Sequence, residues 1–200
     1  MKMTEFEKFL IRSPLRVYFQ RKFEAPPVLA DLGLGTGNIC LEIGCGHGAG
    51  TLLINKYVDC ERVVGIDIDP DMIDSARRYV THPPRWARRI RNDNIELICQ
   101  DAAEMPFPDA YFDAAFMFGA FEHIPEWREV VAEVYRVLKP GGLFSFEEFL
   151  LAGSSGHRFD HEIIAETELT ATLEKTGFII KSYRKAKFIS SRRFAKAVKE

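Results

Sequence analysis

The sequence predicts an α/β fold with a doubly wound, mostly parallel sheet, and two observations carry this prediction. From residue 38 onward, short apolar runs typical of buried strands alternate with segments of helical pattern. The run Ile39–Leu41 leads into Glu42 and then into glycines at positions 44, 46, 48 and 50, ahead of the helix-like Thr51–Ile54. A strand, a glycine turn and a helix form the first unit of a nucleotide-binding α/β sheet.

Length and composition predict one cytoplasmic domain over residues 1–200. The net charge of −2 gives no overall case for a nucleic-acid or anionic membrane partner. We find no run of the ~20 apolar residues that a membrane span needs, and the charged N-terminus lacks a secretory signal pattern. The four cysteines form no metal-ligand spacing, so we expect buried reduced thiols and no metal; they are Cys40, Cys45, Cys60 and Cys99.

Residues 1–37 are predicted to be an N-terminal helical segment. A first short helix would end near Ser13-Pro14, and a second would span Leu15–Phe23. Leu15, Phe19 and Phe23 fall at i, i+4 and i+8 and form an apolar stripe. Because the segment has no sheet pattern, we expect it to pack beside the sheet. The segment is either a lid over a ligand site or a helix packed on the core.

Two segments share the spacing acid-x-Gly-x-Gly-x-Gly, namely Asp31–Gly37 and Glu42–Gly48. A ligand-binding loop needs a strand before it and a helix after it. A helix end precedes Asp31, and only one strand's length follows Gly37 before the next glycines. We therefore interpret Asp31–Gly37 as a turn feeding the first strand and Glu42–Gly48 as the binding loop.

The predicted core, residues 38–150, continues with alternating elements. Asp69 and Pro70 are typical of an N-cap and first helical position. Lys139–Gly142 is predicted to stop a helix. The expected helices span 49–59, 71–80 and 127–138, and the expected strands span 62–67, 95–99, 112–118 and 143–149.

Residues 151–200 are predicted to form a loop at Gly153–Gly156, a helix over 166–175 and two final strands, over 178–183 and within 188–198. Two basic stretches, Arg85–Arg91 and the last twenty residues, fit solvated surfaces or edge strands. A nucleic-acid footprint is the alternative for both, and we assign no clear nucleic-acid site.

Polar and glycine positions follow the ends of four predicted strands. They are Gly44–Gly48, Asp67, Asp101-Ala102 and Met117–Gly119. Asp67 lies nineteen positions after Gly48, the spacing at which an acid bonds ribose hydroxyls in nucleotide-binding units. Because ligands bind at the carboxyl ends of parallel strands, we expect these positions to border one crevice.

Together these motifs resemble the class I S-adenosylmethionine-dependent methyltransferases, in particular the small-molecule, ubiquinone/menaquinone-methyltransferase-like subgroup. The resemblance implies a Rossmann-like, seven-stranded sheet with helices on both faces and an antiparallel edge strand, which Phe194–Val198 fits. The segments that carry it are LEIGCGHGAG (41–50), VVGIDIDPDMI (63–73), CQDAAEMPFPD (99–109), FDAAFMFGAFEHI (112–124) and VLKPGG (137–142).

The resemblance also implies roles toward the cofactor S-adenosylmethionine, whose product is S-adenosylhomocysteine. The glycine turn, with Cys45 in it, would approach the methionine end and Glu42 its amino group; Asp67 would hold the ribose hydroxyls. Ile68 and Met72 would line the adenine, Asp101 would accept from its amino group and the Ala102 N–H would reach its ring. Phe118 and Gly119 would lie beside the methionine. The implied cofactor-binding residues are Glu42, Gly44, Cys45, Gly46, Gly48, Asp67, Ile68, Met72, Asp101, Ala102 and Phe118.

Methyl transfer needs a base only where the acceptor must lose a proton. The candidates for this base are Glu122, His123, His157 and His161. We assign no catalytic residue and keep His123 as the candidate. Aromatic residues expected near the acceptor favour a small, partly apolar molecule, namely Phe6, Phe9, Phe116, Phe118 and Phe121.

Two alternatives remain open. The pairs Tyr135–Lys139 and Tyr183–Lys187 have the Tyr-x-x-x-Lys spacing of NAD-dependent short-chain oxidoreductases. The absence of an obvious base also fits a non-catalytic module that binds S-adenosylmethionine and supports a partner. Calorimetry with NADH and with S-adenosylmethionine would distinguish an oxidoreductase from a methyltransferase. Methyl transfer to a substrate by the isolated chain would argue against the non-catalytic module.

Overall fold

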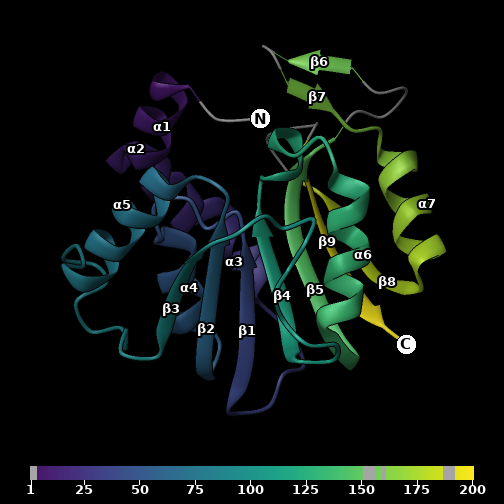
Figure 1. Ribbon diagram of the computed structural model, residues 1–200, viewed down its shortest axis with the longest axis horizontal. Helices are drawn as coiled ribbons and strands as arrows, with labels where there is room; N and C mark the ends of the chain where they lie inside the picture. Colours follow the sequence, from purple (N-terminus) through teal and green to yellow (C-terminus); the bar gives the residue numbers. More distant parts are fainter. Residues whose placement is uncertain (1–3, 151–155, 159–160, 187–191) are drawn as a thin grey trace.

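A seven-stranded sheet in the order β3-β2-β1-β4-β5-β9-β8 forms the centre of the computed structural model, which describes residues 4–150, 156–158, 161–186 and 192–200 (Figure 1). β1 to β5 pair in parallel, and β9 pairs antiparallel with both β5 and β8. The predicted α/β class and the antiparallel strand near the edge are confirmed. The strands are β1 (Asn38–Ile43), β2 (Cys60–Asp67), β3 (Ile95–Cys99), β4 (Phe112–Phe118), β5 (Leu138–Phe149), β8 (Phe178–Lys185) and β9 (Arg192–Lys199).

Helices cover both faces of the sheet, as Figure 1 shows, and a separate pair of short strands, β6 (Gly156–Arg158) and β7 (His161–Ile163), lies beside them. α6 and α7 lie on one face, and α3 and α4 lie on the other. The helices are α1 (Glu5–Arg12), α2 (Pro14–Phe19), the π-helical η1 (Gln20–Glu24), α3 (Ala25–Leu29), α4 (Ala49–Tyr57), α5 (Pro70–Thr81), the 3₁₀ turn η2 (Phe121–His123), α6 (Trp127–Val137) and α7 (Glu166–Thr176).

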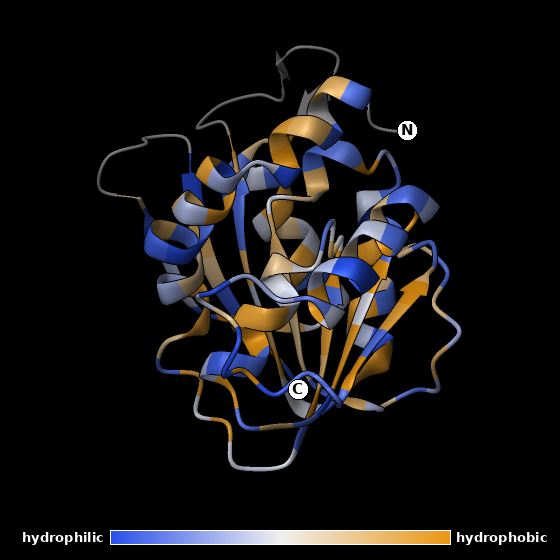
Figure 2. Cartoon of the chain, turned by 90° about the vertical axis from the view of Figure 1, so that its left-hand side faces the viewer, coloured by the Kyte–Doolittle hydropathy of each residue, from blue (hydrophilic) through white to orange (hydrophobic). Residues whose placement is uncertain are grey.

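The central strands are buried on both sides, which explains their continuous apolar sequence. Along β1, Leu41 packs into the cluster under α6 while its neighbour Cys40 faces the cluster under α3 and α4. Figure 2, viewed from the left-hand side of Figure 1, shows hydrophobic strands lying partly behind helices of mixed hydropathy. Each large aliphatic side chain fully buried in this way contributes about 1.5–3 kcal/mol, so the strand ends are held on a rigid base.

The sequence signals for helix ends act as predicted. The Asp69 carboxylate accepts a hydrogen bond from the Asp71 N–H at 2.9 Å, and Pro70 occupies the first turn of α5. Gly177 ends α7 in the left-handed region, with φ of +110°. A side chain there would also meet the Tyr135 hydroxyl at 2.7 Å.

β5 begins earlier than predicted. It starts at Leu138, directly after α6, and therefore contains the Lys139–Gly142 segment that we expected to lie outside it. Phe112 of β4 pairs with Leu138, whereas Ala114 pairs with Leu143. The extra residues form an irregularity in the ladder, with Gly141 at φ of +77°, which accommodates the proline that cannot donate a ladder hydrogen bond.

The N-terminal segment packs beside the sheet through α3, whose Val28 and Leu29 are buried against it, but the apolar stripe of Leu15, Phe19 and Phe23 is exposed. The same segment instead buries Val17, Gln20 and Glu24. Helical periodicity identified an apolar face, but ion pairs made by Glu24 hold the opposite, more polar face against the protein.

Other predictions are refined by the structure. Cys40, Cys45 and Cys60 are buried free thiols, but Cys99 is exposed because β3 is an edge strand, so its predicted burial is wrong. Of the final predicted strand, residues 188–191 lie outside the described residues, as do 153–155 of the predicted loop.

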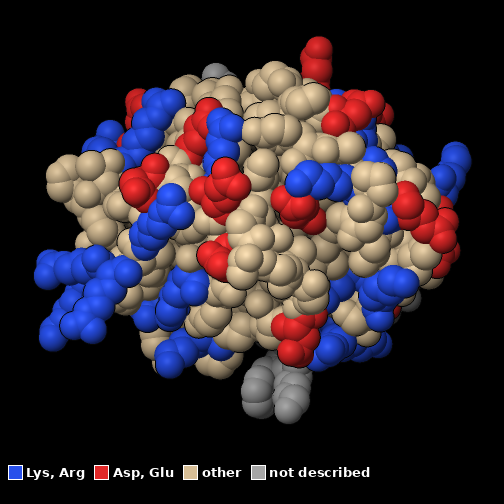
Figure 3. Space-filling view, turned by 90° about the horizontal axis from the view of Figure 1, so that it is seen from below, with Lys and Arg blue, Asp and Glu red and all other residues tan. Residues whose placement is uncertain are grey.

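Charged side chains of both signs are mixed over most of the face of the molecule seen from below, and a group of basic side chains gathers at its left edge (Figure 3). Within the basic stretch 85–91, Arg85, Arg88, Arg89 and Arg91 are exposed, as expected of a solvated surface. A search of the helices in the described part of the chain finds none with the length and apolarity that crossing a membrane requires.

Candidate active site

A pocket of about 480 Å³ lies at the carboxyl ends of β1, β2, β4 and β5. This is the edge of an open α/β sheet where ligands bind, and the volume is typical of small-molecule sites. The loops after β1, β2, β3 and β4, the end of β5 and the N-terminal helices all contribute to its wall. The strand ends that the sequence singled out therefore do converge on one pocket.

The glycine turn after β1 forms the first part of the wall. Gly44 has φ of +66°, and a Cβ there would lie 2.8 Å from the Cβ of Ala120, so only glycine fits. Gly46, at φ of +53°, donates its N–H to the Asp67 carboxylate at 2.9 Å. The turn is thereby fixed against both the β4 loop and the end of β2.

Glu42 is a buried carboxyl at the end of β1. It accepts a hydrogen bond from the Thr51 hydroxyl of α4, and a Cβ on Gly50 would overlap its Oε1. Burial raises the pKa of Glu42 to about 8, although the Thr51 hydrogen bond acts in the opposite direction. The side chain lines the pocket and can present either a neutral or an ionised carboxyl to a ligand.

Asp67 closes β2 and also faces the pocket. Its Oδ1 accepts from the Asp69 N–H at 3.0 Å and its Oδ2 from the Gly46 N–H at 2.9 Å. Burial raises its pKa, while these two hydrogen bonds oppose the shift. Each oxygen keeps a second lone pair, so the carboxylate is positioned to accept two neighbouring hydroxyl groups.

The turn after β3 completes this side of the pocket. The Asp101 carboxylate accepts the Ala103 N–H at 2.8 Å, which holds the exposed side chain at the rim. Ala102 and Gln100 line the wall beside it, as does Ile68 from the turn after Asp67. This arrangement combines hydrogen-bond acceptors with an apolar surface suited to a flat ring.

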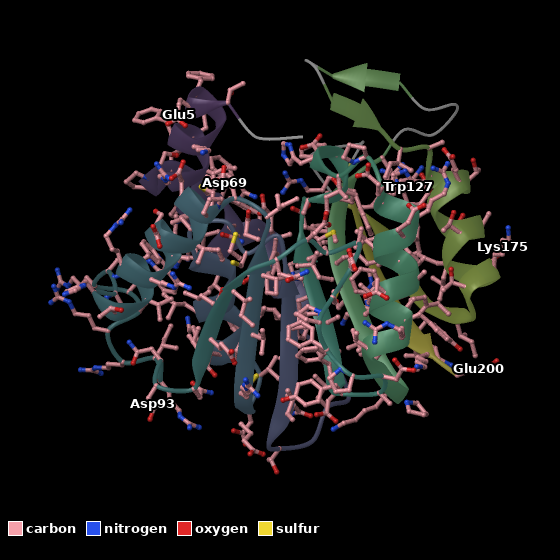
Figure 4. The ribbon with its side chains drawn as sticks, in the orientation of Figure 1. Glu5, Asp69, Asp93, Trp127, Lys175 and Glu200 are labelled. Carbon is pink, nitrogen blue, oxygen red and sulfur yellow. The ribbon has the colours of Figure 1, made fainter. Side chains whose placement is uncertain are left out.

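The N-terminal helices cover part of the pocket through Leu10, Ile11, Arg16 and Gln20. Lys8 of α1 fixes this cover, because its ammonium lies 2.7 Å from the Asp69 carboxylate and 3.0 Å from that of Asp71. These partners hold the pKa of Lys8 above its usual range. In Figure 4, Asp69 lies below the helix that carries Glu5, at the start of α5.

His47 forms part of the same wall and stays neutral near pH 7. It is buried, packs edge-on against Tyr79 with ring centroids 4.8 Å apart, and has a pKa lowered to about 4 by burial and by Arg16 and Arg12.

The other end of the pocket is bordered by Phe118, Gly119 and Phe149, with Glu122 and His123 from η2. The His123 Nε2 lies 3.8 Å from the Glu122 Oε1. His157 and His161 lie in β6 and β7, and their side chains are outside the described set.

Two implied site residues do not line the pocket. Met72 is fully buried in α5, with its methyl group beneath Gly46, where it supports the turn from below. Gly48 is the N-cap of α4, at φ of +90°, and packs against Ala76. The remaining implied residues do border the pocket: Glu42, Gly44, Cys45, Gly46, Asp67, Ile68, Asp101, Ala102 and Phe118.

The expected aromatic wall is largely absent among the described pocket residues. Phe6 and Phe9 are exposed on α1, and Phe116 and Phe121 are fully buried in the core, so only Phe118 of that set borders the pocket. Leu10, Ile11, Ile124 and Phe149 supply apolar surface in their place.

The sequence interpretation missed Glu147 and Arg192, which both line the pocket. A signal for Glu147 was present, because two consecutive acids end the otherwise apolar strand over 143–149, at the binding edge of the sheet. No local signal marked Arg192, which reaches the site from β9 through long-range pairing.

The oxidoreductase pairs do not form a site within the described residues. Tyr135 packs edge-on against Phe178, and Lys139 pairs with Asp113 at 2.7 Å, so both are structural. Tyr183 lies in β8, and Lys187 falls outside the described residues. Across the described part of the chain, no three His, Cys, Asp or Glu side chains group closely enough to hold a metal ion.

Residues 41–146 match the family model described as "Methyltransferase domain". A sterol 24-C-methyltransferase of Eremothecium gossypii is 33% identical over 120 residues, which are 60% of this chain and 30% of that protein. A demethylmenaquinone methyltransferase of Symbiobacterium thermophilum is 34% identical over 152 residues, 76% of this chain and 57% of that protein. The chain thus matches less than two thirds of the length of either relative.

The fold is also found in solved structures. A SAM-dependent methyltransferase from Aquifex aeolicus superposes with a TM-score of 0.79 at 21% identity, covering 98% of this chain and 99% of that one. At this identity the likeness concerns the fold, including the seven-stranded sheet and the helices on its two faces.

Proposed function

This chain belongs to the class I S-adenosylmethionine-dependent methyltransferases, and we propose that it transfers a methyl group to a small, partly apolar acceptor. Its cofactor is S-adenosylmethionine. The observation that carries the proposal is the convergence of Gly46, Asp67 and Asp101 on one pocket that also has an apolar end.

The described residues fit this cofactor. The glycine turn leaves backbone exposed where a Cβ would intrude, and Asp67 keeps acceptor capacity on both oxygens. We assign the methionine portion to Gly44–Gly46 with Cys45 and Phe118, its amino group to Glu42, and the ribose hydroxyls to Asp67. Ile68, Asp101 and Ala102 would hold the adenine, whereas Met72 and Gly48 would support the turn and the start of α4.

The bound sulfonium would supply an activated methyl group, and the protein's contribution is position and environment. Holding the acceptor in line with the methyl group can supply roughly 7–11 kcal/mol of the barrier. The glycine turn fixes one reactant, and the walls formed by Phe118, Phe149 and Ile124 orient the other.

Within the N-terminal segment, residues 1–37, we propose that α1 and α2 act as a lid, whereas α3 is buried against the sheet. α1 and α2 supply Leu10, Ile11 and Arg16 to the pocket wall, and a buried lysine, Lys8, joins α1 to Asp69 and Asp71. A short helix that is held by a few polar contacts, these two ion pairs and the Arg12 bond to the Asp71 carbonyl, can open to admit a ligand and close over it. Residues 38–150 would then form the cofactor-binding core, with 151–200 completing the sheet.

The proposed acceptor class follows from the lining of the pocket beyond Phe118. Ile124 and Phe149 give this end an apolar surface, interrupted by a few charged groups. Ile11 of α1 lies instead over the glycine turn, 3.5 Å from where a Cβ of Gly46 would be. The names of the two curated relatives, a sterol methyltransferase and a demethylmenaquinone methyltransferase, suggest acceptors with large apolar parts. A small molecule with an apolar body and one polar group fits such a site.

Calorimetric titration tests the cofactor assignment. S-adenosylhomocysteine should bind at one site per chain, NADH should not bind, and Asp67→Ala should weaken binding by about tenfold or more because buried ligand hydroxyls lose their acceptor. Methyl release by the isolated chain to a panel of small acceptors would exclude the non-catalytic module. Binding of NADH in preference to S-adenosylhomocysteine would overturn the assignment.

A further inference from the structure

Glu147 is a buried carboxyl that opens on the acceptor end of the pocket. It lies at the carboxyl end of β5 with no exposed surface, and it lines the pocket together with Gly119 and Phe149. A Cβ on Gly119 would lie 3.1 Å from the Glu147 Oε1. Because Gly119 has no side chain, the carboxyl has an open path to the pocket.

The carboxyl of Glu147 lacks the hydrogen bonds that a buried acid normally has. Neither oxygen accepts a hydrogen bond from the residues that the structure describes. Among the described residues, the cation closest to it is Arg192, whose Nη1 lies 3.3 Å from Oε2. That nitrogen also pairs with Glu24, and the Arg16 Nη1 binds the same Glu24 at 2.6 Å. Both guanidinium groups are therefore committed first to Glu24.

The neighbouring Glu148 provides the contrast. It is equally buried, but its carboxylate accepts the N–H groups of Phe121 and Phe149, each at 2.8 Å. Glu148 does not line the pocket. One acid at the end of β5 thus has a structural role, while the other faces the pocket with its acceptor capacity unused.

We propose that Glu147 accepts a hydrogen bond from a hydroxyl group of the acceptor and takes up its proton during methyl transfer; this inference rests on the proposed function. The acceptor O–H bond breaks, and its proton passes to a carboxylate oxygen of Glu147. The oxygen's electron pair forms the new bond to the methyl carbon, while the pair of the broken carbon–sulfur bond stays on sulfur. Glu147 becomes neutral as the sulfonium charge is lost.

The choice between a hydroxyl and an ammonium group rests on the charge that develops during transfer. Arg16 and Arg192 line the same pocket, but both pair with Glu24, and Glu122 and Glu126 lie in the same wall. An oxygen that develops negative charge would be stabilised by these guanidinium groups. We therefore assign a neutral hydroxyl as the partner of Glu147, and the amine probe below tests this choice.

The protonation behaviour of Glu147 suits this role. Burial, reinforced by the charge of Glu24, raises its pKa to about 8, and Arg192 and Arg16 oppose the shift. Glu122 from η2 and the adjacent Glu148 complete the titratable groups around it. A base whose pKa lies near the operating pH is efficient in proton transfer.

Three probes with one carbon skeleton test the inference without turnover. Protein saturated with S-adenosylhomocysteine is titrated with 4-ethylphenol, 2-phenylethylamine and ethylbenzene. The phenol should bind about tenfold more tightly than ethylbenzene, since the site is built to pair with a donor. Its binding should tighten as pH rises through the pKa of Glu147. Glu147→Leu should remove the preference while S-adenosylhomocysteine binds as before.

A second variant keeps the test independent of folding. Glu147→Gln preserves the shape and should abolish the pH dependence of phenol binding, whereas the matched control Glu148→Gln should keep it. Equal binding of phenol and ethylbenzene by the parent, or an unchanged preference in Glu147→Leu, overturns the inference. Tighter binding of the amine overturns the hydroxyl assignment, and a parent that does not bind S-adenosylhomocysteine overturns the proposed function instead.

Discussion

Lys8 and Asp69 form an ion pair of 2.7 Å whose side chains are only 7% and 5% exposed. The pair joins α1 to the loop that follows β2. The Asp69 carboxylate also caps α5 by accepting the Asp71 N–H, and the Asp69 N–H donates to the pocket carboxylate of Asp67. A change in the position of α1 is therefore transmitted through one residue to the part of the wall assigned to the cofactor's ribose.

Lys8→Met should loosen the cover of the pocket. Removing the ammonium leaves the Asp69 carboxylate buried without its cation, and α1 loses its main polar attachment. We expect several-fold faster amide hydrogen exchange over residues 5–12 and several-fold weaker binding of S-adenosylhomocysteine. Lys22→Met, at an exposed lysine on η1, is the control and should change neither quantity. An unchanged rate of amide hydrogen exchange over α1 in Lys8→Met would contradict the proposal that Lys8 holds α1 over the pocket.

Gly44→Ala and Gly35→Ala distinguish the two glycine motifs. At Gly44, a Cβ meets Ala120 at 2.8 Å and the backbone has φ of +66°; at Gly35 nothing lies within 4 Å. Gly44→Ala should destabilise the protein by about 1–3 kcal/mol through overpacking and backbone strain. Gly35→Ala should change stability by no more than about 0.5 kcal/mol. Urea denaturation measures both, and similar losses would contradict our reading of Asp31–Gly37 as a simple turn.

Glu42→Gln should alter how stability depends on pH. The pKa of Glu42 rises from 4.5 to about 8 on folding, so its folded state binds a proton more tightly than the unfolded chain. The stability contributed by this group is full below about 4.5 and is lost as pH rises toward 8. The loss is at most about 1.4 kcal/mol per pH unit in that window.

The measurement is urea denaturation of the ligand-free parent and of Glu42→Gln at several values from pH 5 to pH 8. The Gln variant keeps a hydrogen-bond partner for Thr51, and its free energy of unfolding should rise relative to that of the parent as pH rises. A difference between the two proteins that does not vary with pH would show that Glu42 is already ionised in the folded state.

Arg192→Met should be strongly destabilising. Its guanidinium is the cation shared by Glu24 and Glu147, whose side chains are 3% and 0% exposed. Breaking a buried pair by removing one partner typically costs about 3–5 kcal/mol. Arg62→Met removes a surface pair with Glu96 and should cost no more than about 1 kcal/mol. Urea unfolding measures both variants. Equal losses of unfolding free energy in Arg192→Met and Arg62→Met would show that the buried ion pairs of Arg192 contribute no more to stability than a surface pair.

Much of the pocket wall that we assign to the cofactor could be predicted from the sequence because its signals are local. The motifs at 31–37 and 42–48 have the same spacing, yet the elements before and after them distinguish a turn from a binding loop. Parallel strands then bring their carboxyl ends to one edge, so Asp67 and Asp101 could be placed beside Gly46 without coordinates.

The acceptor side could not be predicted in the same way because it depends on long-range contacts. Helical periodicity defines the stripe of Leu15, Phe19 and Phe23 but does not say which face is buried. That choice depends on Glu24 and Arg192, which are 168 positions apart. Arg192 likewise reaches the pocket only because β9 pairs with β5, where Arg192 lies opposite Phe149.

A crystal structure with S-adenosylhomocysteine tests the central claim most directly, namely that four strand-end loops form one cofactor site. We predict the ribose hydroxyls on Asp67, the adenine between Ile68 and Ala102, and the amino group beside Glu42. Glu147 and Phe149 should remain free of the ligand, facing the space left for the acceptor. Density for the ligand outside this pocket, or in it with no contact to Asp67, would contradict the account.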